Sequence, residues 1–295
     1  MGLFAFFILS GASYAAGNLL IAAAAPLSIF YEKKLFKALV RVFLIVGLIF
    51  VMFSPASMSK AISAILILSV FSLFFALQLG AVKMGFTHIV RIIMALCALL
   101  AFWQELKYWK SPSISFVPEK IFVLGGSLSS AEEKLKLKPW PEIFKENSKL
   151  NVLNYSVPGA LASHYVEKAE VVYGDNILVI IECGADDIKM KTPPPEFRKS
   201  LESLMAKIAR TGRMILIFEI PEYPDTRGAY SKIIRETAAK FGAQIIPRRL
   251  IAKIIYEHQK ESLALDQEGN LKIANLIKSF IAENMNNSNK SHENK

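Results

Sequence analysis

The sequence predicts an α/β fold, a flavodoxin-like three-layer sandwich with a five-stranded parallel sheet, preceded by about four transmembrane helices. Three observations lead to this prediction. Long uncharged apolar segments fill residues 1–110, and only two acids, Glu32 and Glu105, fall among them. After residue 118, short apolar runs alternate with segments of helical period. Such alternation is typical of a parallel sheet with helices on both faces.

Four apolar segments make up the first part, at residues 3–30, 38–57, 61–82 and 84–103. About twenty apolar residues suffice to cross a bilayer, so each segment is long enough to span it. The last segment is the weakest because His88 and Arg91 lie inside it. We interpret both as anchors at the membrane interface in preference to parts of an ion pathway. The first segment lacks a basic flank on its amino side, which argues against a cleaved signal peptide.

Basic residues set the expected orientation. Lys33, Lys34, Lys37 and Arg41 follow the first segment, and the positive-inside rule keeps such a cluster in the cytoplasm. Three further crossings then place residues 111–295 outside. By this count six of the nine Lys/Arg in the first 110 residues lie inside and three outside. We therefore expect a multi-pass protein of the cell membrane whose carboxyl-terminal domain lies outside the cytoplasm.

The formal net charge of +10 does not indicate nucleic-acid binding. Residues 1–110 hold nine Lys/Arg and two acids, whereas residues 111–295 hold twenty-six Lys/Arg and twenty-three acids. The excess positive charge therefore lies beside the membrane. Cys97 and Cys183 are expected to form no disulfide, because one lies in an apolar segment and the other at a strand end.

The second part divides into three regions. Residues 111–118 are rich in Ser and Pro and are expected to form a linker. A domain follows over residues 119–284, and the polar residues 285–295 are expected to be disordered. We expect strands at residues 121–124, 152–155, 177–182, 214–219 and 244–247, in the sheet order 2-1-3-4-5. We expect helices near residues 140–147, 162–172, 196–211, 228–241, 249–258 and 268–284.

Ser127 is the candidate nucleophile. It follows the first apolar run and a Gly-Gly turn, at the carboxyl end of a strand, where open α/β sheets present reactive groups. Loops expected at the same face carry Gly159, Gly184, Asp186 and Glu261. In a doubly wound sheet these loops converge on one cleft. A hydroxyl, a glycine N–H that can approach an anion and a polar turn are what acyl transfer requires.

Several sequence blocks resemble those of the SGNH (GDSL) hydrolase family, in the right order over roughly residues 119–284. They are Gly125-Gly-Ser127, Trp140-Pro-Glu-Ile-Phe, Asn154-Tyr-Ser-Val-Pro-Gly-Ala, Val179-Ile-Ile-Glu-Cys-Gly, Pro195-Glu-Phe-Arg-Lys-Ser-Leu, Ile217-Phe-Glu-Ile-Pro and Glu268-Gly-Asn-Leu-Lys-Ile-Ala. The resemblance implies a nucleophile at Ser127. It also implies oxyanion donors from the N–H groups of Ser127 and Gly159 and from a side chain in the third block. Members cleave acyl esters, and we expect neither a cofactor nor a metal.

Two departures from the family pattern affect residues that take part in the family's reaction. The third block reads Gly184-Ala-Asp-Asp187, so Asp186 replaces an asparagine that donates to the oxyanion. An ionised carboxylate about 4 Å from an oxyanion would repel it by roughly 4 kcal/mol at an effective dielectric constant near 20. Only a protonated Asp186 could donate. The fifth block ordinarily reads Asp-x-x-His, and counting back from Gly269 places Glu261 at the aspartate and Ala264 at the histidine.

The site therefore needs another base. His258 could serve only if its loop refolds toward Ser127, and His164 lies on a helix that should carry it away. Glu261 could be the nearest titratable group, although a carboxylate with an ordinary pKa is a poor base for a serine hydroxyl. We expect no histidine nitrogen within about 2.6–3.2 Å of that hydroxyl. The acids after the third strand, Glu182, Asp186 and Asp187, are interpreted as solvated and not as metal ligands.

Two functions follow from these residues. The first is a membrane-anchored hydrolase of acyl or acetyl esters, with a lipid or glycan substrate. The alternative is a catalytically impaired module of the same fold that binds an acylated glycan, a lipid or a protein partner. The presence of Ser127, Gly159 and Gly184 favours the hydrolase, whereas Ala264 and Asp186 favour the binding module.

Overall fold

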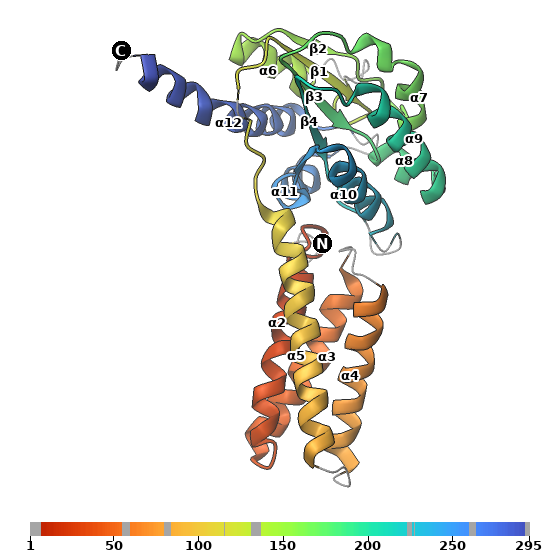
Figure 1. Cartoon of the computed structure of the whole chain (residues 1–295), viewed down its shortest axis with the longest axis vertical. Helices are drawn as coiled ribbons and strands as arrows, with labels where there is room; N and C mark the ends of the chain where they lie inside the picture. The colour runs from red at the N-terminus through yellow and green to blue at the C-terminus, as the bar shows by residue number, and fades with distance from the viewer. Residues whose placement is uncertain are drawn as a thin grey trace. The chain divides into compact units, whose positions relative to one another are not determined.

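The computed structural model describes residues 7–54, 60–79, 84–114, 116–130, 137–222, 226, 228–259 and 264–292. The chain divides into two compact units (Figure 1). One contains the described residues up to Lys110 together with Thr226 and Gly228, and the other contains the described residues of Ser111–Glu222 and Ala229–Lys295. We describe each unit separately.

The first unit consists of long apolar helices. They are α2 (Ala12–Leu27), α3 (Lys34–Phe53), α4 (Lys60–Leu79) and α5 (Met84–Leu106), with short 3-10 turns η1 (Ser28–Phe30) and η2 (Lys107–Trp109). Within the described residues, four helical segments are long and apolar enough to cross a membrane, as expected: Ala12–Phe30, Lys34–Phe53, Ala61–Gln78 and Gly85–Trp109. The helix α2 begins at Ala12, after a turn in which Gly11 adopts a left-handed conformation with φ 81°, and residues 7–9 before this turn are also helical.

Two glycines allow α2 and α3 to pack closely. A Cβ atom on Gly17 would lie 2.7 Å from the carbonyl oxygen of Gly47, and one on Gly47 would lie 2.9 Å from that of Gly17. At the end of α2, Arg91 on α5 donates hydrogen bonds to the hydroxyl and the carbonyl of Ser28, at 2.7 and 2.8 Å. A cation at the carboxyl end of a helix is electrostatically favourable.

The second unit is built on a five-stranded parallel sheet in the order β2-β1-β3-β4-β5, which confirms the expected order. The strands are β1 (Lys120–Gly125), β2 (Val152–Asn154), β3 (Ile177–Glu182), β4 (Arg213–Phe218) and β5 (Gln244–Ile246). The strand β3 is buried along its whole length, as expected for a parallel strand covered on both faces.

Helices cover both faces of the sheet, which gives the expected three layers. The elements α6 (Trp140–Ser148), α11 (Arg248–His258) and α12 (Gln267–His292) pack on one face through a core that includes Phe144, Ile251 and Ile277. On the other face lie α7 (Ala162–Glu167), α9 (Pro194–Ile208) and α10 (Ala229–Phe241), with Tyr165, Leu201 and Ile234 in the core. Side chains alternate along each strand, so every strand contributes to both cores.

Three details differ from the sequence expectations. The helix expected at residues 162–172 ends as α7 at Glu167, and the 3-10 turn η4 (Ala169–Val171) follows it. A five-residue helix, α8 (Ala185–Lys189), follows β3 and was not expected, because one and a half turns give no hydrophobic period. The helix α12 continues to His292, into the polar tail expected to be disordered.

Candidate active site

Ser127 lies in the turn that follows β1, and its side chain is buried. The turn is held by backbone hydrogen bonds: the N–H of Gly126 donates to the carbonyl of Glu182, and the N–H of Ser129 donates to that of Gly126, both at 3.2 Å. The hydroxyl of Tyr165 on α7 donates to the carbonyl of Gly125. The position of Ser127 is therefore fixed from two elements besides its own strand.

Three loops meet at the hydroxyl of Ser127. Its Oγ donates a hydrogen bond to Oδ1 of Asp186 at 2.7 Å, and its backbone N–H donates to Oδ2 of the same carboxylate at 2.7 Å. The N–H of Gly159 donates to Oγ at 3.0 Å. The loops after β1, β2 and β3 thus converge at the carboxyl edge of the sheet, as expected.

Gly159 and Gly184 have different positions in this arrangement. Gly159 has φ 74°, a conformation that favours glycine, and points its N–H at Oγ. Gly184 has φ 117° and is the amino-terminal cap of α8, the helix that carries Asp186. Gly184 therefore positions Asp186 and has no hydrogen bond of its own to Ser127.

The Gly125-Gly126 turn makes room for two acids. A Cβ atom on Gly126 would lie 1.9 Å from Oδ2 of Asp186, much closer than any real contact. A Cβ atom on Gly125 would lie 2.8 Å from Oγ of Ser129 and 3.0 Å from Oε2 of Glu182. The missing side chain of Gly126 is what lets the Asp186 carboxylate reach Ser127, and that of Gly125 leaves room for Glu182 and Ser129.

The interpretation of the three acids as solvated is wrong. Glu182, Asp186 and Asp187 are only 1, 4 and 1% exposed. The cost of burying the Asp186 carboxylate is offset by the two hydrogen bonds from Ser127, and Asp187 accepts one hydrogen bond from the N–H of Ala162 at 3.1 Å. Neither carboxyl oxygen of Glu182 has a hydrogen-bond partner among the described residues. Within the part of the chain that the structure describes, no group of three or more His, Cys, Asp or Glu could hold a metal ion.

Burial changes the acidity of these groups. It raises the pKa of Glu182 well above its ordinary value, and the charge of Asp186 raises it further. The nearby hydroxyl and N–H of Ser129 oppose this shift in part, although neither meets hydrogen-bond geometry. Burial likewise raises the pKa of Asp187 to about 6, against the opposing hydrogen bond from Ala162. The site thus disfavours further negative charge.

The structure places His258 in a polar cluster with Asp266, just before the last helix α12, and with Lys272 on that helix. Its Nδ1 lies 3.2 Å from Oδ2 of Asp266, and Nζ of Lys272 lies 2.8 Å from its Nε2. Within the described residues, the side-chain and backbone hydrogen bonds of Ser127 join it to Asp186 and Gly159, and none joins it to His258. Asp266 was not among the expected site residues, because only the fold brings it to His258.

Two of the other positions considered for the base, His164 and Ala264, lie within the described residues. The ring of His164 stacks edge-on against Tyr165, with centroids 5.2 Å apart, and its Nε2 is buried without a partner among the described residues. Ala264 is buried, with 6% exposure, where the family resemblance expects a histidine. Glu261 lies outside the described residues.

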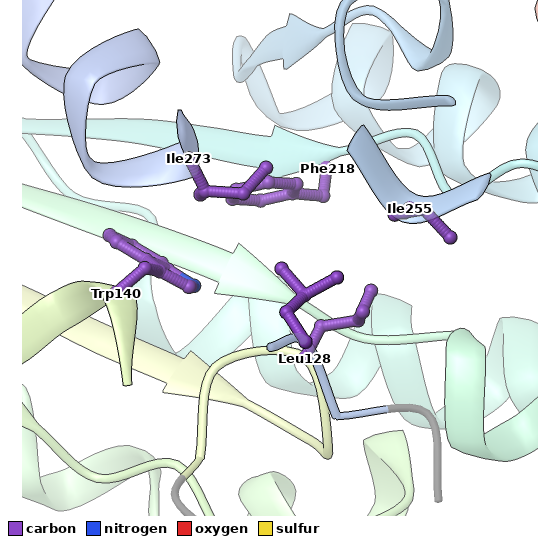
Figure 2. Close-up of a pocket in the computed structure, with 6 residues that line it drawn as sticks. Leu128, Trp140, Phe218, Ile255 and Ile273 are labelled. Carbon is purple, nitrogen blue, oxygen red and sulfur yellow. The ribbon is translucent and has the colours of Figure 1, made fainter. Parts of the chain in front are cut away.

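A small apolar pocket begins one residue beyond Ser127 (Figure 2). Its lining residues come from the turn after β1, from β4, from the helices on one face of the sheet and from the segment before α12: Leu128, Trp140, Phe218, Ile255, Leu265 and Ile273. The volume of the cavity is about 10 Å³, which is room for about one water molecule. The indole N–H of Trp140 donates to Oγ of Ser129 at 3.0 Å and so fixes one wall.

Comparisons with known proteins agree with the resemblance. No protein-family model matches the chain. A curated arylesterase from Vibrio mimicus is 25% identical over 129 residues, which are 41% of this chain and 64% of the arylesterase. The chain therefore spans less than two thirds of that relative. The carboxyl-terminal unit resembles SGNH (GDSL) esterases in its sequence blocks and in its sheet order.

Solved structures with a similar fold include two bacterial proteins. The psychrotrophic esterase EstA from Pseudoalteromonas sp. is 19% identical, with a TM-score of 0.49, over 57% of this chain and 99% of that chain. A member of the lipolytic protein G-D-S-L family from Veillonella parvula is 16% identical, with a TM-score of 0.44, over 54% of this chain and 96% of that chain.

Proposed function

We propose that this chain is a serine-dependent ester hydrolase anchored in a membrane by its apolar helices. One observation carries the proposal: the Ser127 hydroxyl, at the carboxyl edge of the sheet, receives the N–H of Gly159 and donates to a buried carboxylate. A hydroxyl with both an acceptor for its proton and a backbone donor beside it has the elements of nucleophilic acyl transfer. The similarity to an arylesterase supports the same chemistry.

In this proposal Ser127 attacks the ester carbonyl and forms an acyl-serine. The N–H of Gly159, which donates to Oγ in the resting state, then donates to the oxyanion that develops beside it. Gly184 contributes by capping the helix that holds Asp186. His258 would have to leave Asp266 and Lys272 before it could act as a base, and Glu261 follows it three positions later in the sequence.

The proposed substrate is an ester with a short acyl group, such as an acetyl ester of a lipid or a glycan near the membrane. The small pocket next to Ser127 supports a short acyl group, because it has room for about one methyl-sized group. The four apolar helices support a substrate at or near the membrane. We further propose that the hydrolase domain lies outside the cytoplasm.

The test compares full-length wild type with Ser127→Ala in detergent micelles, on a p-nitrophenyl ester of acetate and on one of a long-chain acid. We expect the acetate ester to be cleaved faster, and Ser127→Ala to lose at least about 1,000-fold in kcat/KM. The matched control is Ser148→Ala, at the end of α6, which should keep wild-type activity. A serine-reactive phosphonate should label wild type on Ser127 and leave the variant unlabelled.

Two results would count against the proposal. Wild-type turnover by Ser127→Ala would show that another residue is the nucleophile. Absence of both turnover and labelling in wild type would favour the binding module, and retention of an acylated glycan by the inert protein would then test that alternative.

A further inference from the structure

We propose that Asp186 is the general base of this site, taking the proton of the Ser127 hydroxyl in the place of a histidine. The inference rests on the proposed function. It assigns to Asp186 a role opposite to the one that its alignment with an oxyanion-donating asparagine would suggest.

The geometry of the carboxylate is that of a positioned base. Oδ1 of Asp186 lies 2.7 Å from Oγ of Ser127, within the range of about 2.6–3.2 Å that direct proton transfer requires. Oδ2 is held by the backbone N–H of Ser127 at 2.7 Å, so the carboxylate cannot rotate away. Gly126 leaves the space into which Oδ2 fits.

No imidazole competes for this proton within the described residues. Ala264 stands where the family resemblance expects the histidine. His258 has Asp266 at one ring nitrogen and Lys272 at the other. Asp186 is therefore the titratable group in direct contact with the nucleophile.

Other acidic groups lie beside Asp186. Its titratable neighbours are Glu182, Cys183 and Asp187, and the pKa of each is raised, chiefly by burial and also by the charge of Asp186. A proton transferred from Ser127 neutralises Asp186, and the negative charge moves to the substrate oxygen. The carboxylate and the oxyanion are then never charged together, which removes the repulsion expected from an aspartate at this position.

The complete cycle balances with water as the only co-reactant. The Oγ–H bond of Ser127 breaks, the proton goes to Oδ1 of Asp186, Oγ bonds to the carbonyl carbon, and the carbonyl electron pair moves onto oxygen. When this intermediate collapses, the carbon–alkoxy bond breaks, and Asp186 returns the proton to the leaving alcohol. Water then gives a proton to Asp186 and adds to the acyl carbon. Oγ of Ser127 leaves, recovers the proton from Asp186, and the acid is released.

During these steps the donors of the site become available in turn. Protonation of Asp186 weakens its attraction for the backbone N–H of Ser127. That N–H can then donate to the oxyanion, together with the N–H of Gly159. Asp186 thus occupies the N–H of Ser127 only while it is charged.

The decisive variant is Asp186→Asn in the full-length protein, assayed on p-nitrophenyl acetate. Asparagine has nearly the same size, and its amide can accept the N–H of Ser127 and donate to Oγ, so the turn is retained. If Asp186 merely repels the oxyanion, Asp186→Asn should be more active than wild type. If Asp186 is the base, Asp186→Asn should lose at least about 100-fold in kcat/KM. The matched control is Asp187→Asn, the neighbouring acid, which should stay within about threefold of wild type.

A second measurement separates a base from a structural residue. Asp186→Ala should recover activity as formate is added, in a saturable way, because a free carboxylate can occupy the vacated space. The double variant Ser127→Ala/Asp186→Ala should show no such rescue. In addition, Ala264→His in the Asp186→Asn background should raise activity at least about tenfold, by supplying a base at the position where the family resemblance expects one.

The outcomes separate the inference from the function on which it rests. Loss in Asp186→Asn with formate rescue of Asp186→Ala supports the inference. An asparagine variant as active as wild type, with Ser127→Ala inert, overturns it and leaves the proposed function standing. Loss in Asp186→Asn without formate rescue of Asp186→Ala also overturns it, because Asp186 would then be structural. Full activity of Ser127→Ala overturns both.

Discussion

The carboxylate of Asp186 fills the space that a side chain on Gly126 would need: a Cβ atom on Gly126 would lie 1.9 Å from Oδ2 of Asp186. The two residues lie on different elements, the turn after β1 and the helix α8. The φ of Gly126 is not in the left-handed region, so its backbone does not require glycine. The carboxylate of Asp186 is therefore the reason why a side chain cannot be placed at position 126.

This relationship predicts a strong coupling between the two positions. Gly126→Ala should destabilise the protein by about 1–3 kcal/mol, because the methyl group must displace the buried carboxylate. In the Asp186→Ala background the carboxylate is gone and only the carbonyl of Ala160, at 3.3 Å, stays close, so the same substitution should cost much less. Thermal unfolding of the four proteins in detergent gives the coupling energy, which we expect to be about 1–2 kcal/mol. Equal costs in both backgrounds would show that something other than Asp186 excludes the side chain.

Asp187 should make stability depend on pH. Its pKa is raised by burial from 3.8 in the unfolded chain to about 6. The folded state then holds a proton that the unfolded state has lost, so the contribution is complete below about pH 4 and disappears as the pH rises through 6. Asp187→Asn mimics the protonated form and can still accept the N–H of Ala162. It should stabilise the protein by on the order of 2 kcal/mol at pH 8 and change little at pH 4.

The measurement is the difference in unfolding midpoint between the variant and wild type at the two pH values. Other groups, including Glu182, titrate in both proteins and cancel in this difference. Asp175→Asn is the control, because Asp175 is exposed and should give the same difference at both pH values. A destabilised Asp187→Asn at pH 8 would mean that the carboxylate is needed in its charged form.

Close packing of α2 on α3 predicts a further stability effect. A Cβ atom on Gly47 would lie 2.8 Å from Cγ1 of Ile21 and 2.9 Å from the carbonyl of Gly17. Gly47→Ala should therefore push the helices apart and cost about 1–3 kcal/mol. Gly85→Ala is the matched control, since a Cβ atom there meets nothing within 4 Å. Helical circular dichroism during heating should show a lower midpoint for the first variant only.

The fold was largely predictable because its strands are buried. A strand covered on both faces is a continuous apolar run, and each of the five expected runs lies within two residues of an observed strand. Less was predictable where the chain lacks an apolar period. The short helix α8 has three acidic or basic side chains among its five residues, and nothing in its sequence separates it from a loop.

The site was predictable in its location and not in its electrostatics. Strand ends fixed where Ser127 and Gly159 would meet. They also brought Asp186 within reach of Ser127, 59 positions away, and the structure confirms this contact. What no local pattern indicated is that the contact depends on the missing side chain of Gly126. Acids are usually solvated, so the burial of Glu182 and Asp187 also could not be read from the sequence.

The orientation of the helices remains a prediction, and the structure adds an argument to it. Arg41 on α3 donates to the hydroxyl of Tyr31 at 3.2 Å and to Oε1 of Gln78 on α4 at 2.8 Å. Arg91 on α5 is bonded to Ser28, near the same turn. Basic side chains from two helices are therefore tied to the end of the bundle that carries Lys33 and Lys34, and the positive-inside rule places such an end in the cytoplasm.

Reporter fusions after residue 112 and at the carboxyl terminus should both give the signal of an extracytoplasmic domain. A fusion after residue 33 is the control and should give a cytoplasmic signal. Replacing Lys33, Lys34 and Lys37 by glutamine should produce a mixed orientation, because their positive charges hold this turn inside. Cytoplasmic signals from both carboxyl-side fusions of the wild type would reverse the assignment. The active site would then act on intracellular esters, while the arrangement of Ser127, Gly159 and Asp186 would be unaffected.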